Sequence, residues 1–598
     1  MGSLGGFLDR LPRRWGAWSI GLVVAIELAI APWTAHAFDA TAFLSHSDRI
    51  YFGHVGITAL WAYGSISLGA VLLSQLPVLF FPQLWSATPL RIFLLKLPAW
   101  CADLATAAIV RACSADPRLA NAWALRYLLD PAVVFVTVFH GQVDALPNFF
   151  TVSGIALILA ERYELAGLAF GFGAGTKFYP AAFVPLLVVA AYRQASWRRA
   201  ALAFVAFVGS ATASLLPVLW GRATSVFAAY ANNSFGHEGV VVSSASLWSL
   251  LPRAAPLSIA PQLEQLVGVA IPVLLAAAEL RHVPSRSDVA RAAMLGAMSI
   301  VLLNPGAHPP FYLWIAGPLV LYAAVTGDSI ASLAGFVLSC ASVAMQFCQE
   351  GSDEYFLMNF GTGPTLGLLR CPAPSVVLQA VVLASAVVVV VASYARGRLP
   401  ERASAACRRA AGLVVPLTFA VFVGAFVAEA ASAAANHSVP GFRDEERAIN
   451  TFAVDPSVRN LFDGSCRLTY AANDIVVYAG NPFAARFASA SLGYTLFSPQ
   501  EIRVRGRARS VGSLPSKFEN IDVRTIGGKS IRITREFDVS DALRPFRYVE
   551  RLEERPCSLI RDNPLLIYRF DFDAAQAAAA ATPLRRRLDI FERGVGKE

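Results

Sequence analysis

The sequence predicts a polytopic α-helical membrane protein that ends in a small water-soluble domain. Of its 598 residues, 56% are hydrophobic and only 15% are charged, and the mean hydropathy is +0.52. Many apolar runs have about the 20 residues that a helix needs to cross roughly 30 Å of hydrocarbon. From about residue 434 the composition changes, and short alternating runs typical of strands follow. We therefore predict a transmembrane region over 1–433 and an extracytoplasmic β or α+β domain over 434–598.

The apolar runs predict about thirteen transmembrane helices. The first, from Trp15 to Trp33, follows the basic segment Arg10-Leu11-Pro12-Arg13-Arg14, which favours a cytoplasmic N-terminus. A cleaved secretory signal is the alternative, because Ala35-His36-Ala37 resembles a cleavage site. The other predicted spans are 64–82, 90–112, 121–140, 145–160, 164–192, 200–219, 264–281, 288–304, 311–326, 329–347, 375–395 and 411–433.

Alternation of these spans from a cytoplasmic N-terminus predicts the side of each loop. It places three basic segments inside, as the positive-inside rule requires: 193–199, 281–286 and 396–409. It places outside the loop after the first span, the connections 220–262 and 348–374, and everything after about 434. We therefore expect a multi-pass protein of the cell membrane, a bacterial inner membrane, with its C-terminal domain outside the cytoplasm.

The distribution of charge argues against nucleic-acid binding, and the spacing of the cysteines argues against a zinc or redox motif. The net charge of +9 comes from Lys and Arg in short segments between apolar runs, so it does not indicate nucleic-acid binding. The eight cysteines contain no C-x-x-C spacing, so no zinc or redox motif is identified. No metal ligands are predicted, and a need for a divalent metal stays open.

Four cysteines fall on the predicted outer side, where disulfides persist. We expect Cys466 to pair with Cys557 and Cys348 to pair with Cys371. Four unpaired thiols are the alternative.

The loop after the first span is unusually polar for this chain. Within 38–51 it carries two carboxylates, Asp39 and Asp48, together with His46 and Arg49. A carboxylate just outside the membrane can act as a general base. It can also simply cap a helix, which is the structural alternative for Asp39.

Charges inside predicted spans are costly, so they indicate function or pairing. Lys96 and Asp103 are seven residues apart on one predicted helix, which predicts a structural ion pair. Lys177 lies in the glycine-rich and proline-containing stretch 171–180, which predicts a broken helix lining a cavity. There it can hold a phosphate as a point charge, or extend to the membrane surface.

Two more polar segments interrupt long apolar runs. The alternation places 140–144 on the cytoplasmic side, so we expect Asp144 to be a structural hydrogen-bonding residue. It places 304–312 outside, which makes Asn304 and His308 candidate site residues. The external loop 232–238 is expected to be solvated.

The order of these segments resembles the GT-C class of polyprenyl-phosphate-sugar-dependent membrane glycosyltransferases, especially bacterial relatives of GPI mannosyltransferases and dolichyl-phosphate-glucose glucosyltransferases. The segments that carry the resemblance cover about residues 15–330. They are Asp39 after the first span, 96–103, Asp130-Pro131 leading to 141–144, 176–180 with 184–186, and 304–312. The chain departs from the class in lacking a D-x-D pair in the first loop and in having Tyr63-Gly64-Ser65 and His308-Pro309.

The resemblance implies an inverting membrane enzyme. It would transfer a hexose such as mannose from a polyprenyl-phosphate donor to an extracytoplasmic glycan, lipid or protein acceptor. Asp39 would be the general base, with Asp48 as the second candidate. The residues expected to bind substrate are His308, Asn304, Lys177, Arg49 and His46. The sugar and the use of a metal are left open by the departures.

Two readings from other classes remain. A transporter or flippase of a lipid-linked sugar also uses broken helices and buried charges. A membrane scaffold that presents the C-terminal domain would leave Lys177 without a purpose.

Overall fold

We analysed a computed structural model of the chain. It describes residues 13–36, 64–80, 88–219, 283–304, 307–350, 374–395 and 401–436. It also describes Asp39, Ala40, Phe43, Leu44, Ser47 and Glu279, and short strands between 474 and 569. His46, Asp48 and Arg49 lie outside the described residues, as do the connections 220–262 and 351–373.

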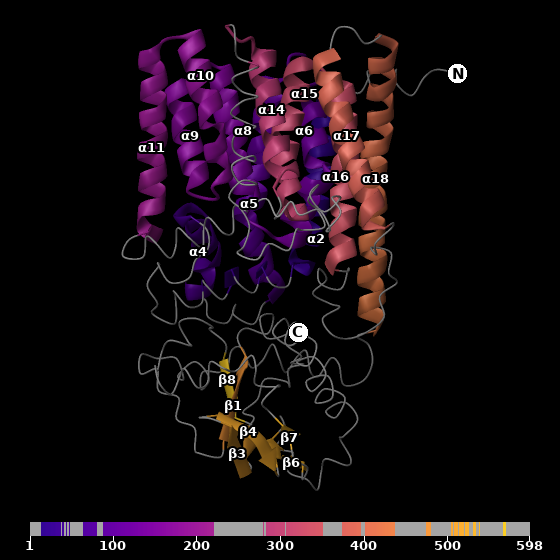
Figure 1. Ribbon diagram of the computed structural model, residues 1–598. Coiled ribbons are helices and arrows are strands. Elements are labelled where there is room, and N and C mark those ends of the chain that lie inside the picture. The colour runs from indigo at the N-terminus through magenta and orange to yellow at the C-terminus, as the bar shows by residue number, and fades with distance from the viewer. Residues whose placement is uncertain are drawn as a thin grey trace, which may run out of the picture.

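Long helices make up most of the described region and run side by side (Figure 1). The helices of the first half are α2 (Arg13–Ile30), η1 (Ala31–Trp33), α4 (Ser65–Phe80), α5 (Thr88–Cys113), α6 (Ala120–Leu128), α7 (Pro131–Val133), η3 (Val134–His140), α8 (Ala145–Leu159), α9 (Tyr163–Ala174), η4 (Tyr179–Phe183), α10 (Val184–Gln194) and α11 (Trp197–Leu219). Those of the second half are α14 (Arg286–Leu302), η6 (Pro309–Tyr312), α15 (Leu313–Thr326), α16 (Ser329–Glu350), α17 (Ser375–Ala395) and α18 (Glu401–Asn436).

The protein is a multi-pass membrane protein. Among the described residues, six helices are long and apolar enough to cross a bilayer, or seven if the bent pair α6 and 131–140 is one span. Three shorter apolar helices are Trp18–Trp33, Ser65–Pro77 and Ala145–Leu159. Each of the other predicted spans contains helix, and of 264–281 the structure describes only Glu279. The total of thirteen crossings stays a prediction.

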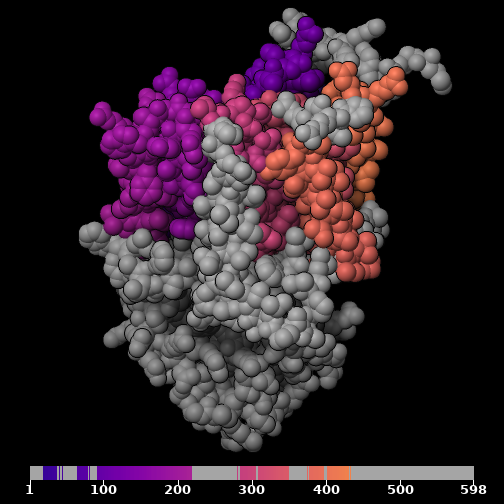
Figure 2. All heavy atoms as spheres, turned by 45° about the horizontal axis from the view of Figure 1, so that its top comes forward, coloured from indigo at the N-terminus to yellow at the C-terminus, as the bar shows by residue number. Residues whose placement is uncertain are grey.

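Close packing in the first half depends on small residues. Gly167 and Gly171 of α9 face α11, and a Cβ atom on either would overlap Ala203 O or Ser210 Oγ. This spacing of four brings two helix backbones together, as small residues do in membrane proteins. Figure 2 shows the purple atoms of α9 to α11 on one side of the molecule and the orange atoms of α17 and α18 on the other. Large apolar side chains such as Leu413 and Val421 are exposed on the outside of α18, where lipid would cover them.

Two helices are broken near polar residues. Between α6 and α7 the chain bends by 46°, and Asp130 caps the new helix by accepting a hydrogen bond from Ala132 N at 3.0 Å. Arg126 Nη1 donates to the same carboxylate at 2.8 Å, which satisfies this buried charge. The predicted span 164–192 is not one helix, because α9 ends at Ala174 and α10 begins at Val184.

The second break supports α4. Gly64 N–H and Ile66 N–H donate to the backbone oxygens of Thr176 and Gly175. Irregular backbone of this kind is tolerated at membrane depth where other protein groups satisfy it. In Figure 1, α4 lies at the lower end of the helices, away from the upper ends of α9 and α11.

The prediction that 140–144 faces the side opposite Asp39 is wrong. His36 N–H donates to His140 O at 2.8 Å, and the His140 imidazole contacts Asp39, so both segments lie at the same end of the helices. The predicted crossing 64–82 contains only the short helix α4, and the predicted crossing 164–192 contains two separate helices, α9 and α10.

Strands occur only in the C-terminal region of the described chain. They are β1 (Asp474–Ala479), β2 (Val504–Arg505), β3 (Arg507–Val511), β4 (Leu514–Glu519), β5 (Ile521–Arg524), β6 (Ser530–Ile533), β7 (Phe537–Asp538) and β8 (Leu566–Arg569). They pair in the orders β2-β1-β8, β3-β4-β7 and β5-β6, and every pairing is antiparallel. An extracytoplasmic domain over 434–598 stays a prediction.

Candidate functional site

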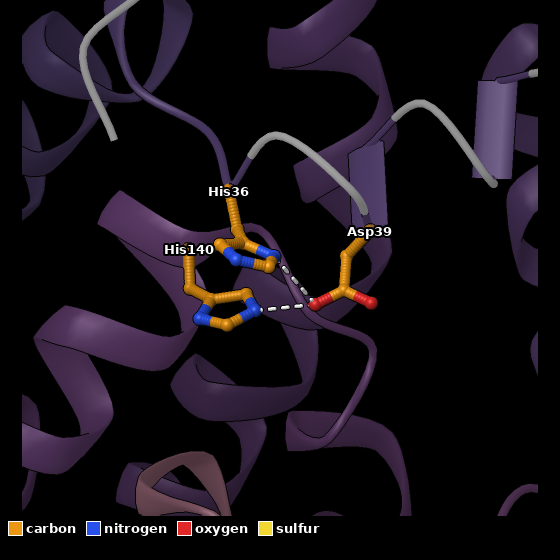
Figure 3. A group of neighbouring side chains, drawn as sticks. All are labelled: His36, Asp39 and His140. Atoms are coloured by element: carbon orange, nitrogen blue, oxygen red, sulfur yellow. Dashed lines mark hydrogen bonds and ion pairs between the residues drawn. The ribbon is translucent and has the colours of Figure 1, made fainter. Parts of the chain in front are cut away.

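One carboxylate oxygen of Asp39 contacts two imidazoles (Figure 3). His140 Nε2 lies 2.5 Å from Asp39 Oδ2, and His36 Nδ1 lies 3.0 Å from the same atom. The two rings are 4.3 Å apart between centroids and tilted by 30°. About 14% of the Asp39 side chain is exposed, against 3% for His140, so Asp39 is the more accessible of the two.

Hydrogen bonds to backbone oxygens join the segment 34–36 to the end of η3. Besides the bond from His36 N to His140 O, Thr34 Oγ1 donates to Val138 O at 2.8 Å. His140 ends η3, a π-helix whose wide turn is closed by Gly141 N–H donating to Val136 O at 3.0 Å. Such π turns are frequent at functional sites. Gly141 then leaves the helix with φ of 79°, a conformation that glycine adopts without a steric cost.

Lys96 of α5 also joins the segment 31–34 to η3. Its buried ammonium donates to Ala31 O at 2.9 Å, to Thr34 Oγ1 at 3.1 Å, and also to the backbone oxygens of Thr34 and Val138. The predicted ion pair between Lys96 and Asp103 is therefore wrong. Asp103 instead accepts hydrogen bonds from Tyr127 and Thr137, each at 2.6 Å. One heptad does not guarantee contact when both side chains find closer partners on neighbouring elements.

The electrostatic balance at Asp39 favours the carboxylate. Burial raises the pKa of the Asp39 carboxyl, but the hydrogen bonds from His140 and His36 and the charges of the two imidazoles outweigh burial. The pKa of Asp39 is held well below its ordinary value. The carboxylate is therefore ionised at neutral pH.

The three side chains can also hold a metal ion. One ligand atom from each of His36, Asp39 and His140 lies within 4.8 Å of the others. Imidazole nitrogen and carboxylate oxygen are ligands that zinc and other divalent transition metals bind in proteins.

A second buried polar group is formed by Asp144, at the end of the segment 140–144, with Lys177 and Trp314. Both oxygens of Asp144 accept from Lys177 Nζ at 2.8 Å, and Trp314 Nε1 donates to Oδ1 at 2.8 Å. The Trp314 ring is stacked between Tyr179, at 4.1 Å, and Phe311, at 4.2 Å. Lys177 Nζ lies 5.5 Å from the centre of the Phe311 ring. Asp144 is hydrogen-bonded as expected, and its partner is the lysine expected to bind phosphate. A purely structural role for Asp144 stays a prediction.

The remaining predicted residues have different environments. Asn304 is buried at the end of α14, and His308 is exposed with its ring 5.9 Å from that of Phe311. These distances bring His308 toward the Lys177 group through Phe311. Nothing is described for Asp48, His46 or Arg49.

Sequence reasoning missed both histidines at Asp39. His36 was read as part of a cleavage-site pattern, and His140 was assigned to the opposite side of the membrane. The available signal was the pair of bulky apolar runs that each end in histidine beside a small residue, Ala35-His36-Ala37 and Phe139-His140-Gly141.

Cys348, near the end of α16, is disulfide-bonded. Its predicted partner Cys371 lies outside the described residues, as do Cys466 and Cys557. A disulfide agrees with an oxidising compartment on that side of the membrane.

Comparison with known proteins identifies the class of enzyme. Residues 75–305 match the model of Glycosyltransferase family 87. This stretch includes Lys96, His140, Asp144, Lys177 and Asn304. The chain is therefore a glycosyltransferase, and the resemblance to membrane glycosyltransferases seen in the sequence is confirmed.

One similar solved structure is a crystal structure of ArnT from Cupriavidus metallidurans bound to undecaprenyl phosphate. The identity is 14%, the TM-score is 0.44, and the match covers 80% of this chain and 85% of that chain. No curated protein matches the chain.

Proposed function

From the match of 75–305 to Glycosyltransferase family 87, we propose a membrane enzyme that transfers a hexose such as mannose from a polyprenyl-phosphate donor, with inversion. The acceptor is an extracytoplasmic glycan, lipid or protein with a free hydroxyl. The observation that carries the proposal is a partly exposed, ionised Asp39 held by two imidazoles at one end of the membrane helices.

Asp39 acts as the general base. Among the contacts that the structure describes, His36 and His140 both bind its Oδ2, so we assign to Oδ1 the proton from the acceptor hydroxyl. As that proton leaves, the acceptor oxygen bonds to the anomeric carbon. The bond from this carbon to the phosphate oxygen breaks, and its electron pair leaves with the polyprenyl phosphate.

The substrate-binding residues are proposed with Asp39. His308 is exposed and can donate to a sugar or phosphate oxygen. In the segment that carries it, Ala307 N–H donates to the backbone oxygen of Asn304 at 3.1 Å. Lys177 adds positive charge near the leaving phosphate, although Asp144 offsets part of that charge. We retain Arg49 and His46 as binding residues and Asp48 as the second candidate base.

We also propose a revised order of membrane crossings. When α4 stays on the outer side and α9 and α10 cross separately, Asp39, 140–144 and 304–308 all face outside. The basic segments named above remain inside, and Arg111, Arg118 and Arg162 join them. The C-terminal region is outside. The thirteen crossings are α2, α5, α6 with η3, α8, α9, α10, α11, 264–281, α14, α15, α16, α17 and α18.

The test is transfer of radiolabelled mannose from polyprenyl-phosphate mannose into acceptors of membrane vesicles that contain the full chain. Asp39→Asn removes the proton acceptor and keeps a similar shape, so transfer should fall by about 10² to 10⁴ fold. Asp48→Asn is the matched control from the same loop. Normal transfer by the Asp39 variant with loss in the Asp48 variant would assign the base to Asp48. Wild-type protein that uses nucleotide sugars but no polyprenyl-phosphate sugar would overturn the proposed donor.

A further inference from the structure

The two side chains that contact Asp39 Oδ2 in the described part of the chain are imidazoles, which bind metal ions. We propose that His36 Nδ1, His140 Nε2 and Asp39 Oδ2 bind one divalent transition-metal ion, and that Zn²⁺ is the ion they fit best. The role given to the ion below rests on the proposed function, but its binding does not.

The ligand set suits this ion. Two imidazole nitrogens and one carboxylate oxygen are a common set of three protein ligands for zinc, with a further position left open. Mn²⁺ and Mg²⁺ prefer more oxygen ligands than this group supplies. The three atoms come from two segments far apart in the sequence, residues 36–39 and the end of η3.

The distances need little change for an ion to enter. Bonds of about 2.0 to 2.2 Å in a tetrahedral site place ligand atoms roughly 3.3 Å from one another. Asp39 Oδ2 is now 3.0 Å from His36 Nδ1 and 2.5 Å from His140 Nε2. Each contact therefore has to lengthen by less than about 1 Å.

The pattern of contacts also points to a shared ion. Both imidazoles direct a nitrogen at the same carboxylate oxygen, and the other oxygen takes part in neither bond (Figure 3). With ring centroids 4.3 Å apart, two protonated imidazoles would repel each other. Two neutral imidazoles that share a dication with the carboxylate avoid this repulsion.

The backbone places the ligands before an ion arrives. His36 N–H is bonded to His140 O, and Lys96 binds the segments on both sides. Protein contacts that orient metal ligands in this way contribute strongly to affinity. Binding therefore requires small side-chain shifts and no rearrangement of the fold.

The ion would act on the leaving group. Two neutral imidazoles, one carboxylate and a dication carry a net charge of +1, which favours binding of a phosphate oxygen at the open position. When the bond between the anomeric carbon and the phosphate oxygen breaks, the ion stabilises the charge left on that oxygen. Asp39 Oδ1 stays available for the acceptor proton.

The experiment measures metal directly in the full chain. Purified protein in lipid nanodiscs is stripped with a chelator and titrated with Co²⁺, whose visible absorption reports a tetrahedral site, and with Zn²⁺ in competition. We expect one ion per chain. His36→Ala and His140→Ala should each weaken binding more than about 100-fold, because even supporting contacts are worth 10 to 100 fold. His308→Ala removes an exposed histidine that is not one of the three proposed ligands, so this variant should bind the metal ion as the wild type does.

The outcomes separate this inference from the proposed function. Failure of the stripped wild-type protein to bind any of these ions would overturn the metal site, whether or not the variants fold. Binding that survives in both His36→Ala and His140→Ala would overturn it as well. If the stripped protein transfers sugar normally and takes up no metal, the proposed function stands without the ion. If metal binds as expected but no polyprenyl-phosphate sugar is used, the site stands and the proposed function fails.

Discussion

The Lys96 side chain lies directly against Gly141, where an added Cβ atom would be 2.9 Å from Lys96 Cε. Gly141 also has φ of 79°, a conformation in which other residues pay about 1 to 2 kcal/mol. Lys96, which bonds both the segment 31–34 and η3, can therefore keep this position only if residue 141 is glycine.

Gly141→Ala should damage both stability and transfer. The added methyl group displaces Lys96 and strains the backbone, and a displacement of about 1 Å near reacting groups can cost 100-fold in rate. Gly327→Ala is the matched control, because Gly327 has φ of 74° and nothing lies within 4 Å of an added Cβ. Thermal unfolding and sugar transfer are measured for both. Equal loss of transfer in the two variants would contradict a specific role for Gly141.

Lys96→Met should release the first loop. The methionine fills the space of the lysine but leaves the oxygens of Ala31, Thr34 and Val138 without their donor. We expect a stability loss of at least about 2 kcal/mol and a larger loss of transfer than stability alone explains. Thr106→Val is the control, because that hydroxyl is buried on α5 and its described contacts, Ala102 O and the Tyr127 side chain, do not involve the segment 31–39. Similar transfer by both variants would count against Lys96 as a positioning residue.

The Lys177–Asp144 pair should show strong coupling. Lys177→Met leaves a buried carboxylate with Trp314 as its remaining described donor, and Asp144→Asn leaves a buried cation. Each should cost about 3 to 5 kcal/mol, and the double variant Asp144→Asn with Lys177→Met should cost less than the sum. Unfolding is followed by the fluorescence of Trp314 and its neighbours. Additive costs would mean that the two charges do not depend on each other.

The same double variant tests the phosphate role of Lys177. If Lys177 also binds the donor, the folded double variant should have a higher KM for polyprenyl-phosphate sugar. An unchanged KM would restrict Lys177 to holding Asp144 and Trp314 in place.

The revised membrane order predicts the side of two short loops. Epitope tags inserted at Asp116 and at Glu161 should be accessible to protease only in inside-out vesicles. If 64–82 were a crossing, 113–120 would lie outside, so access to Asp116 from outside would support that alternative. Reporter fusions after Arg409 and after Asp463 should report opposite sides of the membrane.

Much of the helical architecture could be predicted because apolar runs of spanning length have few other stable structures. Asp39 could be proposed as a site residue because a carboxylate next to a long apolar helix is rare. The two histidines that contact Asp39, His36 and His140, could not be predicted from the sequence. Whether His140 reaches Asp39 depends on the bend after Leu128 and on α4 staying at one end of the helices, and neither leaves a hydropathy signal. The partners of Lys96 and Lys177 are set by contacts across 33 to 65 residues of sequence, which spacing along one helix does not reveal.

The π-helix between Val134 and His140 has a consequence for the length of the chain. Successive residues of an ordinary helix are about 100° apart around its axis. Removal of one residue from 134–139 would convert the wide turn to a normal one and rotate His140 by about that angle, away from Asp39. The composition of this apolar stretch can therefore vary while its residue count cannot, so related chains with the same site should show no insertions or deletions between Pro131 and Gly141.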